Sequence, residues 1–192
     1  MEPNDRWFEW NYAVAMRSGA LHDAISAYKY RDRKGWAIVF GRILVGFLDA
    51  HAETFSSVDL IVGSPAYEGP DAARAWNPVR EVMRAAEHEQ SAPQRWVFDL
   101  QEPPAVTKTA PTPPMVGLKA AERRAVAQTD LRRALRVPDP DRTRGRALVV
   151  FDDVFTGGWT LREVARVLRQ AGGATVVYGV SLARQPFNRR PT

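Results

Sequence analysis

The fold of this 192-residue chain is decided by one stretch, Arg146-Ala-Leu-Val-Val-Phe-Asp-Asp-Val-Phe-Thr-Gly-Gly-Trp-Thr160. Its apolar run, Ala147 to Phe151, predicts a buried strand that ends at two carboxylates, Asp152 and Asp153. A Thr/Gly-rich loop and an amphipathic segment, Leu161 to Gln170, follow at once. The amides of such a turn lie at the positive end of a helix dipole and form an anion site. Acids beside an anion site suit a ligand with both hydroxyls and phosphate, such as a sugar phosphate bound with a divalent cation.

Other phosphate-site motifs do not fit this chain. The sequence has no Gly-x-Gly-x-x-Gly for a dinucleotide and no Gly-Lys-Ser/Thr for a Walker loop. A phosphatase-type Asp-x-Asp would need an acid at position 154, which is Val154. The plain structural alternative is an ordinary strand–turn–helix in which Asp and Thr cap the helix.

Composition favours a globular protein with anionic partners. The chain is 45% hydrophobic and 26% charged, with 27 Lys+Arg against 22 Asp+Glu and a net charge of +5. A basic balance favours phosphates, nucleotides or nucleic acid without choosing among them. The absence of cysteine excludes disulfides, thiol nucleophiles and Cys-based zinc sites. No basic-then-apolar leader and no uninterrupted apolar span are present, so we expect a cytoplasmic protein without a membrane partner.

Segments with helical periodicity alternate with short apolar runs, which predicts an α/β fold with a mostly parallel sheet and helices on both faces. Residues 1–17 are interpreted as an irregular or strand-like entry, and 129–137 are ambiguous. We expect helices over 19–33, 36–52, 71–89 (with a break at Pro78), 118–127 and 159–171, and strands over 57–63, 96–98, 147–151 and 174–182. Ligands of such sheets bind at the carboxyl ends of the strands, where loops 63–70 and 152–160 would emerge together.

A proline-rich segment, residues 101–117, interrupts this alternation. It holds five prolines and predicts an extended, mobile segment that does not form a packed element. The piece that follows contains the acid-pair strand and cannot make a sheet alone. We therefore expect one domain over residues 1–192, with 101–127 as a flexible insertion.

The acid-pair loop resembles the phosphoribosyl pyrophosphate (PRPP) binding motif of type I phosphoribosyltransferases. Further motifs precede it in a fixed order: Tyr28-Lys-Tyr-Arg31, Asp59-Leu-Ile-Val-Gly-Ser-Pro65, Arg74-Ala-Trp-Asn-Pro-Val-Arg80 and Glu122-Arg-Arg124. This order is similar to that of the ComF family, bacterial phosphoribosyltransferase-like proteins linked to DNA uptake. The resemblance spans about residues 12–184, and the acid-pair loop is its specific part.

The chain departs from the ComF pattern in several places. It lacks the Cys-x-x-Cys zinc ribbon of many members, and Arg74-Ala-Trp-Asn77 stands where the family has Arg-Gly-Phe-Asn. Gly63 replaces the first Pro of the usual strand-end turn. In the phosphate loop, Gly157 replaces a Thr, and Trp159 occupies a usually small position. Gly157 keeps the backbone amide, whereas Trp159 is the one feature that argues for a non-catalytic relative.

The resemblance implies Mg²⁺-assisted transfer of a 5-phosphoribosyl group from PRPP to a nitrogenous acceptor, with release of pyrophosphate. The catalytic acids Asp152 and Asp153 would contact the ribose hydroxyls directly or through Mg²⁺. Pyrophosphate departure then depends on fixed dipoles and cations more than on proton transfer. The remaining implied sites are the 5-phosphate loop (Thr156, Gly157, Gly158, Trp159 and Thr160), the pyrophosphate site (Ser64, Pro65 and Ala66, with Arg74 and Lys29 or Lys34) and a closing hood (Lys108 and Arg123).

Several alternatives stay open. The chain could instead be a non-catalytic PRPP- or nucleotide-binding protein, or a DNA-uptake accessory protein. Arginines at 132, 133, 136, 142, 144 and 146 form either a nucleic-acid patch or a solvated face. His22, His51 and His88 have no ligand spacing and are interpreted as structural or exposed. The acceptor would be selected by segments 1–18 and 101–135, in which we find no specific code, and a homodimer is the default assembly.

Overall fold

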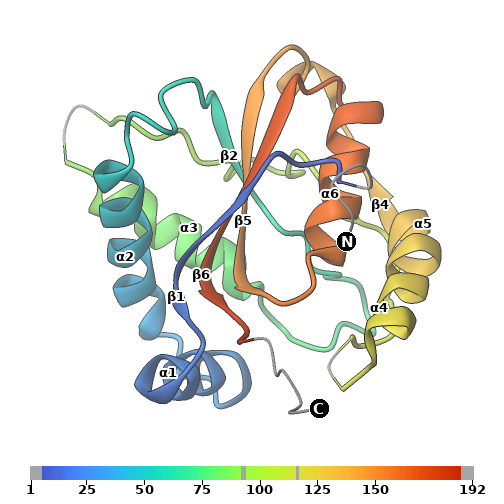
Figure 1. Ribbon diagram of the computed structural model, residues 1–192, viewed down its shortest axis with the longest axis horizontal. Coiled ribbons are helices and arrows are strands. Elements are labelled where there is room, and N and C mark those ends of the chain that lie inside the picture. The colour runs from blue at the N-terminus through green and yellow to red at the C-terminus, as the bar shows by residue number, and fades with distance from the viewer. Residues whose placement is uncertain (1–5, 92–93, 116, 187–192) are drawn as a thin grey trace, which may run out of the picture.

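A computed structural model describes residues 6–91, 94–115 and 117–186 of the chain. Its centre is a four-stranded, entirely parallel sheet with the strand order β1-β6-β5-β2 (Figure 1). The strands are β1 (Asn11–Met16), β2 (Leu60–Gly63), β5 (Ala147–Phe155) and β6 (Val176–Arg184). The predicted α/β class with a parallel sheet is confirmed, and it is the architecture of a type I phosphoribosyltransferase-like fold.

Helices cover both faces of the sheet, as predicted (Figure 1). One face carries α1 (Gly19–Tyr30), α2 (Trp36–Ala50) and α3 (Pro78–Glu89). The other face packs against α6 (Trp159–Gln170). Beside α6 lie the short elements α4 (Ala120–Val126), the π-helical turn η2 (Ala127–Leu131), α5 (Arg132–Ala134), the 3₁₀ turn η3 (Pro140–Arg142) and the antiparallel pair of β3 (Thr107–Lys108) with β4 (Leu135–Arg136).

Alternate residues of β5 enter different cores. Leu148 and Val150 pack with the α6 side, whereas Val149 and Phe151 pack with the α2 and α3 side. All four are buried, as expected for a central strand covered on both faces. The same alternation carries the next two residues, Asp152 and Asp153, toward opposite faces of the sheet.

Several predicted boundaries move. The prediction that β5 ends at residue 151 is wrong, because the ladder to β6 continues through Asp152, Val154 and Phe155. The predicted helix over 71–89 begins only at Pro78, which takes the first helical position where a missing N–H costs nothing. The predicted strand over 96–98 is reduced to one bridge between Ile61 and Phe98. The ambiguous residues 129–137 form η2, α5 and β4.

The proline-rich segment is packed at its centre, so the prediction that 101–117 forms no packed element is wrong there. Ala105 and Val106 are buried in the core on the α6 side. The Ala105 amide donates to Asp99 Oδ2 at 2.6 Å, and Arg142 pairs with Asp99 and donates to the Pro103 carbonyl. A proline run favours an extended chain, and the non-proline residues Thr107 and Lys108 that follow it pair with β4. Flexibility of the remaining insertion and the single domain over 1–192 stay predictions.

Within the described residues, no helix has the length and apolar character needed to cross a membrane.

The two glycines of α2 should respond in opposite ways to alanine, because only one faces α3. A Cβ on Gly41 would lie 2.7 Å from the Ala86 nitrogen, whereas a Cβ on Gly46 meets nothing within 4 Å. Gly41→Ala should destabilise the fold by about 1–3 kcal/mol through overpacking. Gly46→Ala should stabilise it by about 0.5–1 kcal/mol through helix propensity. Urea unfolding of both variants measures the difference, and equal shifts would contradict this packing.

Candidate functional site

Two carboxylates of β5 and one lysine of α1 form the charged centre of the site. Lys29 Nζ lies 2.6 Å from Asp153 Oδ2, and the side chains of this pair are only 18% and 7% exposed. Asp152 faces the other side of the strand, and its Oδ1 accepts the Asp153 amide at 2.9 Å. The two acids are therefore not equivalent: Asp153 is neutralised by α1, while Asp152 turns toward the loop that follows β5.

This arrangement raises the pKa of both Asp152 and Lys29. Burial, followed by the charge of Asp153, raises the pKa of Asp152 from 3.8 to about 7, against an opposing contribution from Lys29. Burial alone would lower the pKa of Lys29, but the Asp153 carboxylate outweighs it and the pKa is raised. Asp152 can therefore exchange a proton near neutral pH, and any cation brought to it would favour its charged form.

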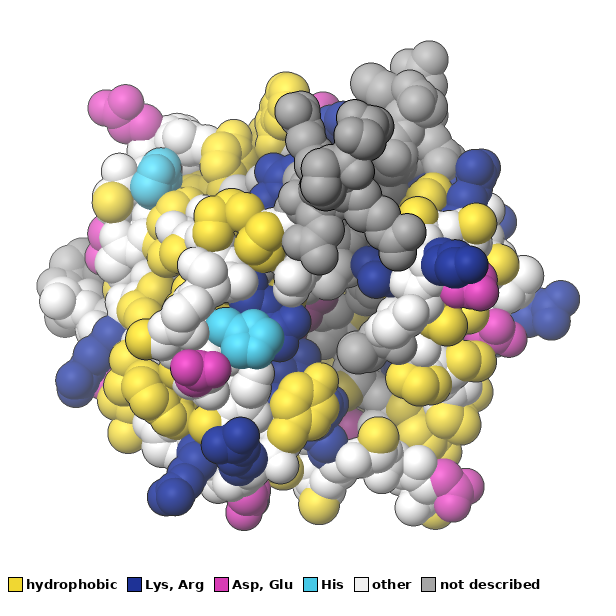
Figure 2. All heavy atoms as spheres, turned by 60° about the horizontal axis from the view of Figure 1, so that its bottom comes forward, with side chains coloured by type: hydrophobic (Ala, Val, Ile, Leu, Met, Phe, Trp, Pro, Cys, Tyr) yellow, Lys and Arg dark blue, Asp and Glu magenta, His cyan; other side chains and the backbone are white. Residues whose placement is uncertain are grey.

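A cavity of about 420 Å³ lies at the carboxyl ends of β2 and β5. Figure 2 is turned so that this edge of the sheet comes forward, and dark-blue Lys and Arg side chains gather near the centre of that face. The sequence-predicted residues that line the cavity are Lys29, Ser64, Pro65, Ala66, Arg74, Lys108, Asp152 and Asp153. The fold thus brings together segments that are more than a hundred residues apart in sequence.

The cations around this cavity are held in different ways. Arg74 Nε donates to the Lys29 carbonyl at 3.2 Å, and its guanidinium lies 5.0 Å from the centre of the Tyr30 ring. Lys108 Nζ donates to Thr112 Oγ1 at 2.6 Å, and burial lowers the pKa of Lys108. Both residues line the cavity, and each side chain is held by a hydrogen bond to a neighbouring residue.

Lys34, the alternative to Lys29, is not among the described residues that line the cavity. Its ammonium lies 5.5 Å from the centre of the Trp76 ring and 3.6 Å from Asp32 Oδ1. The structure therefore brings Lys29, and not Lys34, to the acid pair.

The Arg74-Ala-Trp-Asn77 motif also builds the wall of the cavity. Asn77 Oδ1 accepts the Arg80 amide at 3.2 Å and caps α3, while Trp76 packs edge-on against Tyr28 at 4.9 Å. The Tyr28 hydroxyl donates to the Pro78 carbonyl at 2.8 Å, which ties α1 to the start of α3. The aromatic and amide positions of the motif are thus explained by packing and capping.

The predicted phosphate loop begins α6 as expected. Gly158 has φ +76°, a left-handed conformation that favours glycine, and it precedes the first residue of the helix. A small pocket of about 30 Å³ lies against the loop and is lined by Asp152, Arg123 and Met115, together with Thr156, Gly158 and Thr160. Arg123 Nε is buried there and has no hydrogen-bond partner in the described part of the chain. The hood segment therefore lies directly over the loop.

The sequence did not indicate that Trp159 contacts two arginines. Its ring lies 5.5 Å from the Arg124 guanidinium of α4 and 6.0 Å from that of Arg162 in α6. Such contacts stabilise by about 0.5–1 kcal/mol at exposed sites. Trp159 thereby connects α4 to the phosphate loop, and only the tertiary structure shows this pairing.

Most of the arginines proposed as a nucleic-acid patch have structural partners. Arg132 forms two hydrogen bonds, of 2.9 and 3.0 Å, to the buried carboxylate of Glu163, which also accepts from Arg166 at 2.8 Å. Arg142 is paired with Asp99, and Arg136 donates to two backbone carbonyls. Paired guanidinium groups contribute less to an outward-facing patch, which favours the solvated-face and structural reading of this run.

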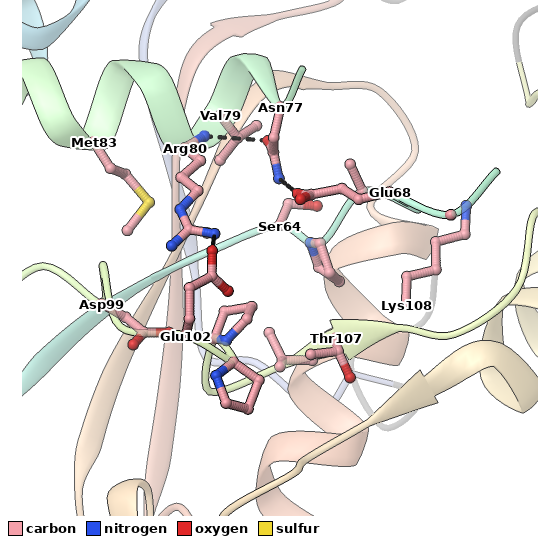
Figure 3. Close-up of a pocket in the computed structure, with 17 residues that line it drawn as sticks. Ser64, Glu68, Asn77, Val79, Arg80, Met83, Asp99, Glu102, Thr107 and Lys108 are labelled. Carbon is pink, nitrogen blue, oxygen red and sulfur yellow. Dashed lines mark hydrogen bonds and ion pairs between the residues drawn. The ribbon is translucent and has the colours of Figure 1, made fainter. Parts of the chain in front are cut away.

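A second cavity, of about 300 Å³, lies on the α3 side of the 64–66 loop (Figure 3). Neither acid of the pair lines it. Figure 3 shows Arg80 directed at Glu102, with which it forms an ion pair, and Asn77 Nδ2 donating to Glu68 Oε1 at 2.9 Å. Because its polar side chains are largely paired with each other, this cavity is less suited to a multiply charged ligand than the acid-pair cavity.

Metal-ligating side chains are few. The described residues contain no group of three or more His, Cys, Asp and Glu side chains placed to hold a metal ion. Two carboxylates are nevertheless a fitting donor set for Mg²⁺, which commonly binds through one or two carboxylates plus substrate oxygens and water.

Comparisons with known proteins point to phosphoribosyltransferase-like proteins. No family model matches the chain. It is 46% identical over 41 residues to an orotate phosphoribosyltransferase of Xylella fastidiosa (strain Temecula1 / ATCC 700964), a match that covers 21% of this chain and 19% of that protein. It is 37% identical over 82 residues to the DNA utilization protein YhgH of Escherichia coli O157:H7, which covers 43% and 34% of the two chains. The chain thus spans a fifth to a third of these relatives, and the similarity is partial.

The raised pKa of Asp152 predicts a pH-dependent stability. Between about pH 4 and pH 7 the folded protein holds a proton that the unfolded chain has released, so stability falls as the pH rises through this window. Asp152→Asn should remove this dependence. The free energy of unfolding of the variant, relative to that of the wild type, should therefore be higher at pH 8 than at pH 5. Urea unfolding at both pH values tests this, with Asp141→Asn, whose side chain is 85% exposed, as the control. Parallel pH profiles of wild type and Asp152→Asn would refute it.

Proposed function

We propose that this chain is a phosphoribosyltransferase of the ComF family, which binds PRPP with Mg²⁺ and transfers the 5-phosphoribosyl group to a nitrogenous acceptor, releasing pyrophosphate. The observation that carries the proposal is the cavity lined by both acids, the 64–66 loop, Lys29 and Arg74. The pocket of the 156–160 loop shares Asp152 with this cavity. Partial similarity to an orotate phosphoribosyltransferase and to a DNA utilization protein supports it.

The ribose would lie over the end of β5. Asp152 and Asp153 would accept hydrogen bonds from the 2- and 3-hydroxyls and offset positive charge that develops on the ring as the bond to pyrophosphate breaks. Lys29 holds Asp153 at 2.6 Å and fixes where that charge lies. Asp152, with its raised pKa, would become fully charged when a cationic partner arrives.

The two ends of PRPP would occupy the two loops. The amides of Thr156 to Thr160, at the N-terminus of α6, would bind the 5-phosphate. The backbone of Ser64, Pro65 and Ala66, with Arg74 and Lys29, would bind pyrophosphate. When bound, Mg²⁺ would be held by substrate oxygens and water next to the Asp152 and Asp153 carboxylates. It would stabilise the negative charge of the leaving group.

The hood residues would complete the site from above. Lys108 lines the acid-pair cavity and Arg123 lines the phosphate-loop pocket, so each adds positive charge to one end of PRPP. Closure over the bound substrate would exclude water and strengthen these interactions.

A non-catalytic role in PRPP, nucleotide or DNA binding is the second candidate function. The specific observation that favours it is the match to a protein described as a DNA utilization protein, over 43% of this chain. In this case DNA binding would weaken with salt and would not depend on Asp152.

Calorimetric titration of PRPP tests the proposed site directly. The wild type should bind PRPP more tightly with Mg²⁺ than without it. Asp152→Asn/Asp153→Asn should weaken binding by more than about tenfold, which corresponds to about 1.4 kcal/mol, because the ribose and metal contacts are lost. Pyrophosphate release with a panel of acceptors then measures turnover.

Asp141→Asn is the matched control, because its carboxylate is 85% exposed and lies outside the cavity. Absence of PRPP binding by the folded wild type would overturn the enzymatic proposal. Salt-sensitive binding of single-stranded DNA that is unchanged in the double variant would then favour the second function.

A further inference from the structure

A third pocket, of about 490 Å³, lies beside the phosphate loop, away from the 64–66 loop. It is walled by four aromatic rings and two guanidinium groups: Phe8, Trp10, Phe155, Trp159, Arg6 and Arg184. Its other described lining residues are uncharged, and none of the described residues that line it is Asp or Glu. We refer to it as the aromatic–arginine pocket.

The aromatic–arginine pocket is assembled from segments that meet only in the fold. Arg6, Phe8 and Trp10 precede β1, Phe155 and Arg184 are the last residues of β5 and β6, and Trp159 begins α6. Because α4 contributes Ala120, the hood also forms part of the wall. These are the N-terminal and hood segments in which the sequence contains no readable acceptor code.

The aromatic–arginine pocket adjoins the proposed reaction centre. It shares Asn11, Phe155, Thr156 and Trp159 with the small pocket that Asp152 also lines. In the strand order β1-β6-β5-β2, the 64–66 loop follows β2 on one side of β5, whereas Arg184 ends β6 on the other. A displacement at carbon 1 of the ribose brings the acceptor to the face opposite the departing pyrophosphate. The pocket therefore lies on the side from which an acceptor would enter.

The lining selects a flat ligand with a negative charge. The Arg6 guanidinium lies 6.0 Å from the centre of the Trp10 ring, and that of Arg184 lies 5.8 Å from the centre of the Phe155 ring. Aromatic faces favour planar rings, and guanidinium groups bind carboxylates with directional hydrogen bonds. The Trp10 side chain is 61% exposed, which leaves a large aromatic surface for a ligand to cover.

We propose that the aromatic–arginine pocket binds the acceptor, and that the acceptor is a small aromatic or heteroaromatic carboxylate that carries a ring or amino nitrogen. This nitrogen bonds to carbon 1 of the ribose as the bond from carbon 1 to the pyrophosphate oxygen breaks. The ring lies against Trp10 and Trp159, and the carboxylate is held by Arg6 and Arg184. The role of this ligand as acceptor rests on the proposed phosphoribosyl transfer. The chemical class of the ligand follows from the residues that line the pocket.

Nicotinate and nicotinamide are matched probes, because they share one ring and differ in the charge of one substituent. Saturation-transfer NMR and calorimetry, carried out without PRPP, should show nicotinate binding at least about tenfold more tightly than nicotinamide. Arg6→Gln and Arg184→Gln should each weaken nicotinate by about tenfold and leave nicotinamide nearly unchanged. Trp10→Ala should weaken both probes.

Arg95→Gln is the control variant, because Arg95 also lies over a tryptophan, 5.0 Å from the centre of the Trp96 ring, but does not line the pocket. Equal affinity for the two probes would overturn the proposal, as would an equal loss in Arg95→Gln. Arg6→Gln keeps the test valid if a change at Arg184, the last residue of β6, impairs folding.

A separate PRPP titration distinguishes this proposal from the proposed function. PRPP binding by a wild type that takes up neither probe would overturn the aromatic–arginine pocket assignment and leave the transferase proposal standing. Charge-selective binding of nicotinate without any PRPP binding would retain the ligand class and overturn the acceptor role. Displacement of nicotinate by a short oligothymidylate at low micromolar concentration would reassign the pocket to nucleic acid.

Discussion

The continuation of the β5–β6 ladder through the acid pair is the constraint on which the site depends. Residues of a strand alternate between its two faces, so consecutive acids within a strand cannot point the same way. Asp153 is directed toward α1, where an unpaired buried charge would cost several kcal/mol, and Lys29 supplies the opposing charge at 2.6 Å. Asp152 is directed toward α6, and no lysine or arginine among the described residues forms an ion pair with it. One backbone constraint therefore separates an acid that is paired with a lysine from an acid whose pKa is raised to about 7.

The constraint also explains why α1 must be held firmly. Lys29 can neutralise Asp153 only if α1 keeps its place against the end of β5. The preceding residue, Tyr28, is almost fully buried, packs against Phe40 of α2 and Trp76, and donates its hydroxyl to the Pro78 carbonyl. Burial, with smaller contributions from nearby carboxylates, raises the pKa of this hydroxyl, so it remains a donor throughout the physiological range. Tyr28 thus holds α1 in place, and this position allows Lys29 to form its ion pair with Asp153.

Local sequence patterns were sufficient for the parallel α/β fold and for placing the acid pair and the 64–66 loop at one edge, because hydrophobic periodicity and strand-end rules are local. Lys29 and Arg74 were assigned to this edge only by the resemblance to the ComF family. The local patterns failed where contacts between residues distant in sequence determine the structure. The acids looked like the start of a loop, yet pairing with β6 keeps them in the strand. The prolines around Ala105 looked like a mobile segment, yet the buried carboxylate of Asp99, compensated by Arg142, binds the Ala105 amide and fixes the chain there. Likewise, the buried carboxylate of Glu163 binds Arg132, which a charge count assigns to a surface patch.

The two departures in the phosphate loop are best understood as one packing change. A Cβ at Gly157 would lie 3.3 Å from Trp159 Cδ1, which is tighter than ordinary van der Waals contact. A large ring at position 159 thus favours glycine at position 157. Glycine lacks a side chain but keeps its backbone amide. Phosphate binding at a helix N-terminus relies on backbone amides, so these two positions would leave the proposed 5-phosphate site with its donors. What changes is the surroundings: the Trp159 ring contacts Arg124 of the hood and walls the aromatic–arginine pocket. The residue that looked like a loss of the motif therefore couples the hood, the phosphate loop and the neighbouring pocket.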